Sequence, residues 1–233
     1  MLTRQYKRPL PTNRRIMPDY ALQRFNMVES QVRTSDVTDE RVLAAMDEVP
    51  RERFVPASKR GIAYADTALE IVPGRFMLSP RNFGKMLQAA VIEPGDKVLD
   101  VGCASGYSSA VLAKLARSVI ALEQDADLVR AASDMLPAVG ATNALVVQGS
   151  LAEGARQHAP YDVIFINGGI ESDPRALLAQ LNEGGRLIAI KRKGAEGRAQ
   201  LYVKENGHVG NWPVFDAHAP VLPGFREPVG FVF

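Results

Sequence analysis

The stretch Lys97-Val98-Leu99-Asp100-Val101-Gly102-Cys103-Ala104-Ser105-Gly106-Tyr107 decides the fold of this chain. Its apolar first half predicts a buried strand, a glycine-punctuated turn follows, and a helix begins at Tyr107. Gly102 and Gly106 let the backbone turn sharply and approach a ligand closely, because neither carries a Cβ. The helix N-terminus behind them offers unpaired N–H groups and the positive end of its dipole. The stretch therefore predicts a strand, turn and helix that can bind a nucleotide-containing cofactor.

Two acidic residues accompany this turn. Asp100 ends the first strand, and Glu123 ends the next predicted strand, about twenty residues further on, where an acidic side chain usually binds a ribose diol. The spacing G-x-x-x-G, with an acidic residue two positions ahead, differs from the G-x-G-x-x-G of dinucleotide sites. It resembles motif I of the S-adenosylmethionine-dependent methyltransferases with a Rossmann-like fold. The alternative interpretation is a tight strand-to-helix turn that binds no ligand.

Length and composition indicate a globular chain with one main α/β domain. The 233 residues are 46% hydrophobic and 23% charged, and the net charge of +2 forms no basic stripe that would indicate a nucleic-acid partner. The single cysteine, Cys103, excludes an internal disulfide and fits a reducing, cytoplasmic setting, and its place in the turn favours packing over nucleophilic chemistry. We expect no membrane span, no secretory signal and no metal site, since the three histidines lie far apart in the sequence.

Strands and helices alternate after the turn. The expected strands are 118–123, 144–148, 163–167 and 186–190, and the expected helices are 107–115, 126–136 and 174–181. This alternation predicts a mostly parallel sheet with helices on both faces, and its ligands bind at the carboxyl ends of the strands. Beyond Lys193, Asn206-Gly207 between two apolar segments predicts a C-terminal antiparallel hairpin, and residues 228–233 a last strand.

The part before the turn divides into an arm and a helical segment. Residues 1–18 are basic and contain prolines, so we expect a disordered arm, or else the product of an upstream start with Met17 opening the native chain. Helices are expected over 19–31, over 39–49 with Thr38 as N-cap, and from Pro80 with Ser79 as N-cap. We expect 19–92 to form a lid over the site, and 93–233 to form the cofactor-binding domain.

Several segments closely resemble one family, the protein-L-isoaspartate O-methyltransferases. Met-Val-Glu-Ser-Gln at 27–31, the segment 38–46 and Val-Pro-Arg-Glu-Arg-Phe-Val-Pro at 49–56 match its N-terminal signature, and the likeness continues through 93–106, 160–162 and 181–187. The resemblance implies a class I methyltransferase sheet with S-adenosylmethionine as donor and a carboxylate of damaged aspartyl residues as acceptor. An ionised carboxylate is already a nucleophile, so catalysis would rest on positioning and on excluding water.

Three places depart from the family pattern. Leu78 stands where the family has the serine that hydrogen-bonds the reacting carboxylate, and Ser79, one residue later, is the catalytic candidate as well as a helix cap. Gly149-Ser150-Leu151 replaces Gly-Asp-Gly near the adenine. Asn-Gly-Gly-Ile-Glu at 167–171 replaces threonine and alanines, and the basic run 191–193 replaces an apolar-glycine turn. That run is either a solvated strand end or a rim that attracts an acidic acceptor.

The residues receive the following expected roles. Gly102, Cys103, Ala104, Ser105 and Gly106 surround the methionine part of the donor, and Asp100 orients the loop or the amino group. Glu123, with Gln124 beside it, binds the ribose, Ser150 and Leu151 border the adenine, and Asn167 lies at a neighbouring strand end.

Three functions remain open at this point. The first is a methyltransferase that acts on isoaspartyl proteins or peptides, or on a small carboxylate. The second is a cofactor-binding homologue without isoaspartyl activity, acting on another acceptor or through protein contacts. The third is a nicotinamide-dependent oxidoreductase, against which the missing G-x-G-x-x-G argues.

Overall fold

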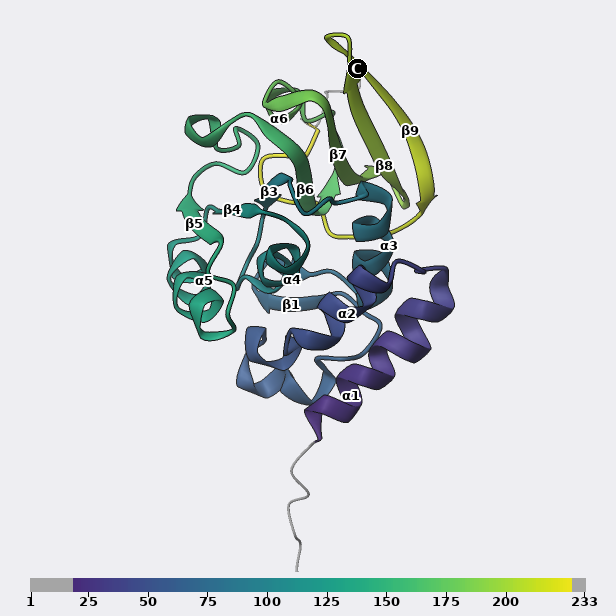
Figure 1. The fold of residues 1–233 in the computed structure, drawn as a ribbon, viewed down its shortest axis with the longest axis vertical. Coiled ribbons are helices and arrows are strands. Elements are labelled where there is room, and N and C mark those ends of the chain that lie inside the picture. Colours follow the sequence, from purple (N-terminus) through teal and green to yellow (C-terminus); the bar gives the residue numbers. More distant parts are fainter. Residues whose placement is uncertain (1–18, 228–233) are drawn as a thin grey trace, which may run out of the picture.

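A seven-stranded sheet is the centre of the computed structural model, which describes residues 19–227 (Figure 1). Its strand order is β5-β4-β3-β6-β7-β8-β9. The first five strands in that order run parallel, and β8 and β9 add an antiparallel hairpin at the edge. The strands are β3 Lys97–Val101, β4 Ser118–Glu123, β5 Ala144–Gln148, β6 Tyr161–Ile170, β7 Leu181–Lys193, β8 Glu196–Glu205 and β9 His208–Asp216. The predicted parallel sheet with a terminal hairpin is confirmed.

The two faces of the sheet have different covers. Val98 of β3 and Val119 of β4 face a large apolar cluster that includes side chains of α3, α4 and α5, whereas Leu99 and Leu122 face a smaller one. The smaller cluster is completed by α6 and by residues near the C-terminus rather than by long helices. The helices are α3 Pro80–Ala90, α4 Tyr107–Leu115, α5 Ala126–Ala138 and the short α6 Arg175–Leu178.

The N-terminal segment packs onto the first of these clusters. It contains α1 Tyr20–Met27, a π-helical turn Val28–Val32, α2 Glu40–Glu48 and 3-10 turns at Arg33–Ser35, Arg51–Phe54 and Ala57–Ile62. Met27 and Met46 are buried in the same cluster as the strand residues Val163 and Ile188. The segment and the sheet therefore share one core. The division into a lid of residues 19–92 and a cofactor-binding domain remains a prediction.

Several predicted element bounds were wrong. The N-cap of α2 is Asp39 and not Thr38: its carboxylate accepts from the Arg41 N–H at 2.9 Å, while the Thr38 N–H donates to Gln88 Oε1 of α3 at 2.6 Å. The helix expected over 174–181 is only four residues long, and β7 begins at Leu181, because that residue already pairs with Tyr161 of β6. The arm 1–18 and the strand expected over 228–233 lie outside the described residues.

Two turns carry the chain back on itself. Asn206 and Gly207 both have positive φ (52° and 75°), the conformation of the tight hairpin turn that their sequence predicts between β8 and β9. Gly74, with φ 77°, closes a smaller hairpin between β1 Leu69–Val72 and β2 Arg75–Met77, which form a separate two-stranded sheet. The sequence marks the turn at Pro73-Gly74 but not the hairpin. This small sheet places Arg75 beside the glycine loop.

Candidate functional site

The glycine loop follows β3 and is fastened on both sides. Gly102 N–H donates to the Leu122 carbonyl of β4 at 2.9 Å, and the Ser105 hydroxyl donates to the Phe54 carbonyl at 2.5 Å. Gly102 and Gly106 have φ values of 77° and 99°, a conformation that glycine adopts without strain, and the sharp turn predicted at these residues is present. Ala104 also has positive φ (49°), which is unusual for a residue with a Cβ. Strain of this kind gathers at ligand sites.

Glu123 lies behind the loop with no exposed surface. Its Oε2 accepts from the Ala104 N–H at 2.8 Å, and its Oε1 accepts from Gln124 N–H at 2.8 Å and Asp125 N–H at 3.2 Å. Arg75 of β2 forms an ion pair with the same carboxylate through Nη2. Glu123 therefore lies at the carboxyl end of β4, and a cation from a distant segment contacts it, while its binding of the ribose stays a prediction.

Asp100 is also fully buried, and only neutral groups donate to it. The hydroxyl of Ser108 in the first turn of α4 donates to Oδ2 at 2.7 Å, the Ser109 hydroxyl donates to the same oxygen, and the Asn167 amide donates to Oδ1. Burial raises the pKa of Asp100 to about 6, although these hydrogen bonds act in the opposite direction. Asp100 therefore ties the start of α4 to β3 and to Asn167 of β6, which agrees with the predicted orienting role.

Of the other residues predicted to bind the cofactor, some are buried and some are exposed to solvent. Cys103 is buried, and burial raises the pKa of its thiol well above the usual range, which agrees with packing rather than nucleophilic chemistry. Gln124 and Ser150 are exposed. Leu151 is completely buried in the smaller apolar cluster, so its side chain is part of the core in this structure. The adenine-bordering role of Ser150 and Leu151 stays a prediction.

Two side chains fill the space above the glycines. A Cβ built on Gly102 would lie 3.2 Å from Leu222 Cδ1 and 3.3 Å from Arg75 Nη2, and one built on Gly168 would lie 2.5 Å from Leu222 Cγ. The glycines, the Glu123 carboxylate and the loop N–H groups are the groups that an adenosyl ligand requires. The site therefore fits such a ligand, and room for it depends on the movable ends of Leu222 and Arg75.

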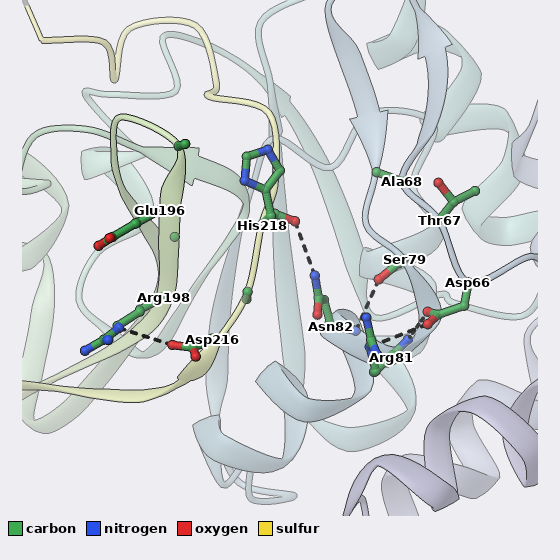
Figure 2. Close-up of a pocket in the computed structure, with 13 residues that line it drawn as sticks. Asp66, Thr67, Ala68, Ser79, Arg81, Asn82, Glu196, Arg198, Asp216 and His218 are labelled. Carbon is green, nitrogen blue, oxygen red and sulfur yellow. Dashed lines mark hydrogen bonds and ion pairs between the residues drawn. The ribbon is translucent and has the colours of Figure 1, made fainter.

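A hollow lies at Ser79. It is an open cleft of about 730 Å³, bordered by the start of α3, by the β7–β8 turn and by the segment after β9 (Figure 2). The Ser79 hydroxyl accepts from Asn82 N–H at 3.4 Å, so the predicted N-cap is confirmed. Asn82 donates to the His218 carbonyl at 3.2 Å across the cleft, and the ion pairs Arg81–Asp66 and Arg198–Asp216 lie on its two sides.

Two short segments join the cleft to the glycine loop. Residues 75–79 run from Arg75, against Gly102, to Ser79, and residues 218–222 run from His218 to Leu222, also against Gly102. Four residues of extended chain span at most about 14 Å, so the backbone at Arg75 and at Leu222 lies within that distance of Ser79 and His218, which line the cleft. Leu78 itself is buried in the core, so the structure does not bring a hydroxyl to the place where the family has its serine.

The sequence did not identify several residues of this site. Arg51 is fully buried and donates to the Leu78 carbonyl at 2.6 Å and to the Ala63 carbonyl at 2.8 Å, with its guanidinium 4.7 Å from the Tyr107 ring centre. It thereby links the wall of the cleft to the start of α4. Arg75 and Leu222 were missed too. The only sequence feature that could have indicated the burial of Arg75 is strand alternation, because Arg75 and the buried Met77 are two residues apart and share one face of β2.

The basic run 191–193 forms the carboxyl end of β7, and two of its three cations have partners. Lys191 Nζ lies 2.7 Å from Asp173 Oδ1, and Arg192 donates to the Gly194 carbonyl at 2.9 Å. Both cations therefore have partners within the protein.

Within residues 19–227, no helix combines the length and apolarity needed to cross a bilayer. No group of three or more histidine, cysteine or acidic side chains in this range is placed to hold a metal ion.

The sheet order, the glycine loop and Glu123 define a Rossmann-like class I methyltransferase. Residues 23–214 match the family described as protein-L-isoaspartate(D-aspartate) O-methyltransferase, and the chain belongs to this family of S-adenosylmethionine-dependent enzymes, as its sequence predicts. The protein-L-isoaspartate O-methyltransferase of Koribacter versatilis is 43% identical over 169 residues, which are 72% of this chain and 76% of that protein. The one from Methanoculleus marisnigri is 37% identical over 193 residues, 82% of this chain and 87% of that protein.

Solved structures agree on the fold. A protein-L-isoaspartate O-methyltransferase matches with a TM-score of 0.76 at 22% identity, covering 88% of this chain and 66% of that one. A putative family member from Plasmodium falciparum, in complex with S-adenosyl-L-homocysteine, matches with a TM-score of 0.74 at 22% identity, covering 85% of this chain and 97% of that one.

Proposed function

We propose that this chain transfers a methyl group from S-adenosylmethionine to a carboxylate of isoaspartyl residues in proteins or peptides. The observation that carries the proposal is the buried Glu123 carboxylate beside the glycine loop, at the carboxyl end of β4. Family membership and the relatives' activity support the acceptor class. The single buried cysteine supports a reducing, cytoplasmic setting.

The donor supplies a methyl group on a positively charged sulfur, which an acceptor carboxylate can take without a strong base. The chain's residues then have to bind and orient. Glu123 would accept from the ribose hydroxyls, the N–H groups at the start of α4 would face the polar end of the donor, and Asp100 would hold the loop against α4. The cleft at Ser79 would take the acceptor, because it is open enough for a peptide and lies within a few residues of the loop.

The first test is a calorimetric titration with S-adenosylhomocysteine. Glu123→Gln keeps the size of the side chain but removes the charge, and we expect it to weaken binding by about 1–3 kcal/mol. Glu48→Gln, which alters an exposed carboxylate paired with Lys114, serves as the matched control and leaves affinity unchanged. Equal affinity of wild type and Glu123→Gln would contradict the assignment of the donor site.

The second test is methyl transfer to an isoaspartyl peptide, with the aspartyl peptide of the same sequence as control. Transfer to the isoaspartyl form alone supports the proposal. Donor binding without transfer to it would instead support the homologue that lacks isoaspartyl activity, which the buried Leu78 and the exposed Ser150 favour. Those two residues replace a serine and an aspartate of the family pattern.

A further inference from the structure

Arg75 is an unusually buried cation. It begins β2, its side chain is 5% exposed, and its partner Glu123 has no exposed surface. The other ion pairs of residues 19–227 all contain at least one side chain that is more accessible to solvent. Taking a guanidinium out of water is costly unless its N–H groups are used. If Arg75 had only a structural role, its guanidinium nitrogens would be expected to have hydrogen-bond partners within the protein.

The N–H groups of Arg75 are largely unused. Only Nη2 has a partner, whereas Nε and Nη1 are buried and have none. Glu123 on its side accepts from three backbone N–H groups besides Arg75, which is enough to stabilise a buried carboxylate. The Glu123 carboxylate therefore has enough hydrogen-bond donors without Arg75. The ion pair leaves two of the three guanidinium nitrogens without a partner.

The position of Arg75 shows where an additional partner would lie. Its Nη2 would be 3.3 Å from a Cβ on Gly102, the glycine that opens the cofactor loop. From Arg75 the chain reaches Ser79 in the cleft within four residues. The guanidinium therefore lies against the loop, and the backbone of Arg75 lies within about 14 Å of the cleft residue Ser79. A planar fork of N–H donors binds carboxylates in a two-bonded geometry that lysine cannot reproduce.

We infer that Arg75 binds a carboxylate of a ligand in this site, and that Glu123 is its partner when no ligand is present. The inference rests on the proposed function, in which two carboxylates come to the site. One belongs to the amino-acid part of the donor, and the other is the acceptor. As the ribose hydroxyls take their place at Glu123, Nη2 becomes available, and the unused nitrogens give the guanidinium a complete fork toward the incoming carboxylate.

The test compares two nucleosides. S-adenosylhomocysteine carries the amino-acid part with its carboxylate, and 5′-methylthioadenosine is the same thionucleoside with a methyl group in place of that part. Titrations use the full chain as wild type, as Arg75→Gln, which removes the cation, and as Arg75→Lys, which keeps the charge without the fork. Arg117→Gln removes an exposed arginine at the amino-terminal edge of β4 and is the matched control. Thermal unfolding confirms that each variant is folded.

The ratio of the affinities for the two nucleosides shows whether Arg75 binds the carboxylate of the donor or that of the acceptor. If Arg75 binds the donor carboxylate, Arg75→Gln lowers the preference for S-adenosylhomocysteine over 5′-methylthioadenosine by tenfold or more, and Arg75→Lys restores little of it. If Arg75 binds the acceptor, that ratio is unchanged and the KM for the isoaspartyl peptide rises tenfold or more. Arg117→Gln changes neither quantity.

Two other outcomes overturn the inference in distinguishable ways. If wild type binds both nucleosides and Arg75→Gln changes neither the ratio nor the KM, Arg75 only fastens Glu123, and the proposed function stands. If wild type binds neither nucleoside, the proposed function fails, and the inference about Arg75 fails with it.

Discussion

At the scale of single residues, two buried carboxylates on adjacent strands have different environments. Glu123 accepts from backbone N–H groups and forms an ion pair with Arg75, whereas Asp100 accepts only from hydroxyl and amide groups. Burial without a cationic partner is the main reason why the pKa of Asp100 rises to about 6. The charge of Asp100 therefore couples folding to pH.

The raised pKa predicts a pH dependence of folding. The folded protein binds the Asp100 proton more tightly than the unfolded chain, so the free energy of unfolding falls as pH rises from about 4 through about 6, and this effect is complete about one pH unit above the folded-state pKa. Asp100→Asn lacks this effect and keeps the shape of the side chain. We expect the variant to gain about 2 kcal/mol relative to wild type between pH 4.5 and pH 7.5.

Urea denaturation at the two pH values measures this difference. Asp162→Asn is a suitable control, because that carboxylate accepts from Lys97 N–H and Asn182 at the opposite end of the sheet. A stability difference between Asp100→Asn and wild type that is the same at both pH values would contradict the effect of burial.

The acidic residues could be predicted from sequence, but Arg75 could not. Asp100 and Glu123 each end an apolar run, and the carboxyl ends of parallel strands meet at one edge of a sheet. Arg75 belongs to a three-residue strand, too short to show a period, and its partner lies 48 residues away. Local patterns do not reveal such a pairing.

At the scale of elements, the start of α3 gives Ser79 two candidate roles, because this residue both caps the helix and lines the cleft. The cap can be separated from contact with the acceptor by substitution. Ser79→Ala removes both the cap and the hydroxyl, whereas Ser79→Asp keeps an N-cap oxygen. If Ser79 is only a cap, Ser79→Ala loses about 1 kcal/mol of stability, Ser79→Asp loses little, and both keep their kcat/KM.

Thermal unfolding and steady-state methyl transfer distinguish the two roles. A stable Ser79→Asp with at least tenfold lower kcat/KM would show that the hydroxyl contacts the acceptor. Ser58→Ala, at an exposed serine outside the cleft, gives the baseline for removing a hydroxyl.

The same element scale shows which parts of the fold the sequence determines. The strands β3, β4 and β5 and helix α4 lie at the predicted residues, because apolar runs mark them and a glycine adjoins one end of β3, of β5 and of α4. Helix α6 was predicted too long, since the local pattern over 174–181 is helical but the pairing of Leu181 with Tyr161 takes its last turn into the sheet. Tertiary pairing overrides local preference there.

At the scale of the whole molecule, the C-terminal segment formed by residues 218–225 packs beside β6 and over the glycine loop. The Gly169 N–H donates to the Pro220 carbonyl at 2.8 Å, the Leu222 N–H donates to the Gly169 carbonyl at 2.9 Å, and the Glu171 N–H donates to the Phe225 carbonyl at 2.9 Å. These bonds fasten the segment along the carboxyl end of β6. No nearby sequence pattern predicts this contact, because it joins segments far apart in the chain.

The position of Leu222 predicts an effect on donor affinity. Its side chain lies above both Gly102 and Gly168, so an adenosyl ligand bound over these glycines would have to displace it, and the free energy of that displacement would lower the apparent affinity. Leu222→Ala removes the obstruction. We expect S-adenosylhomocysteine to bind about tenfold more tightly, a gain of about 1.4 kcal/mol, while the free energy of unfolding falls by about 2–5 kcal/mol through the loss of a buried leucine.

Calorimetry and denaturation on the same preparation separate the two effects. Leu177→Ala, which truncates another buried leucine of the same apolar cluster but not one above Gly102 or Gly168, should lose stability without gaining affinity. Weaker binding by Leu222→Ala would mean that Leu222 is a wall of the donor site and contacts the ligand. In that case the C-terminal segment contributes to binding, and the loop, Glu123 and Leu222 together form the site that the first glycine motif begins.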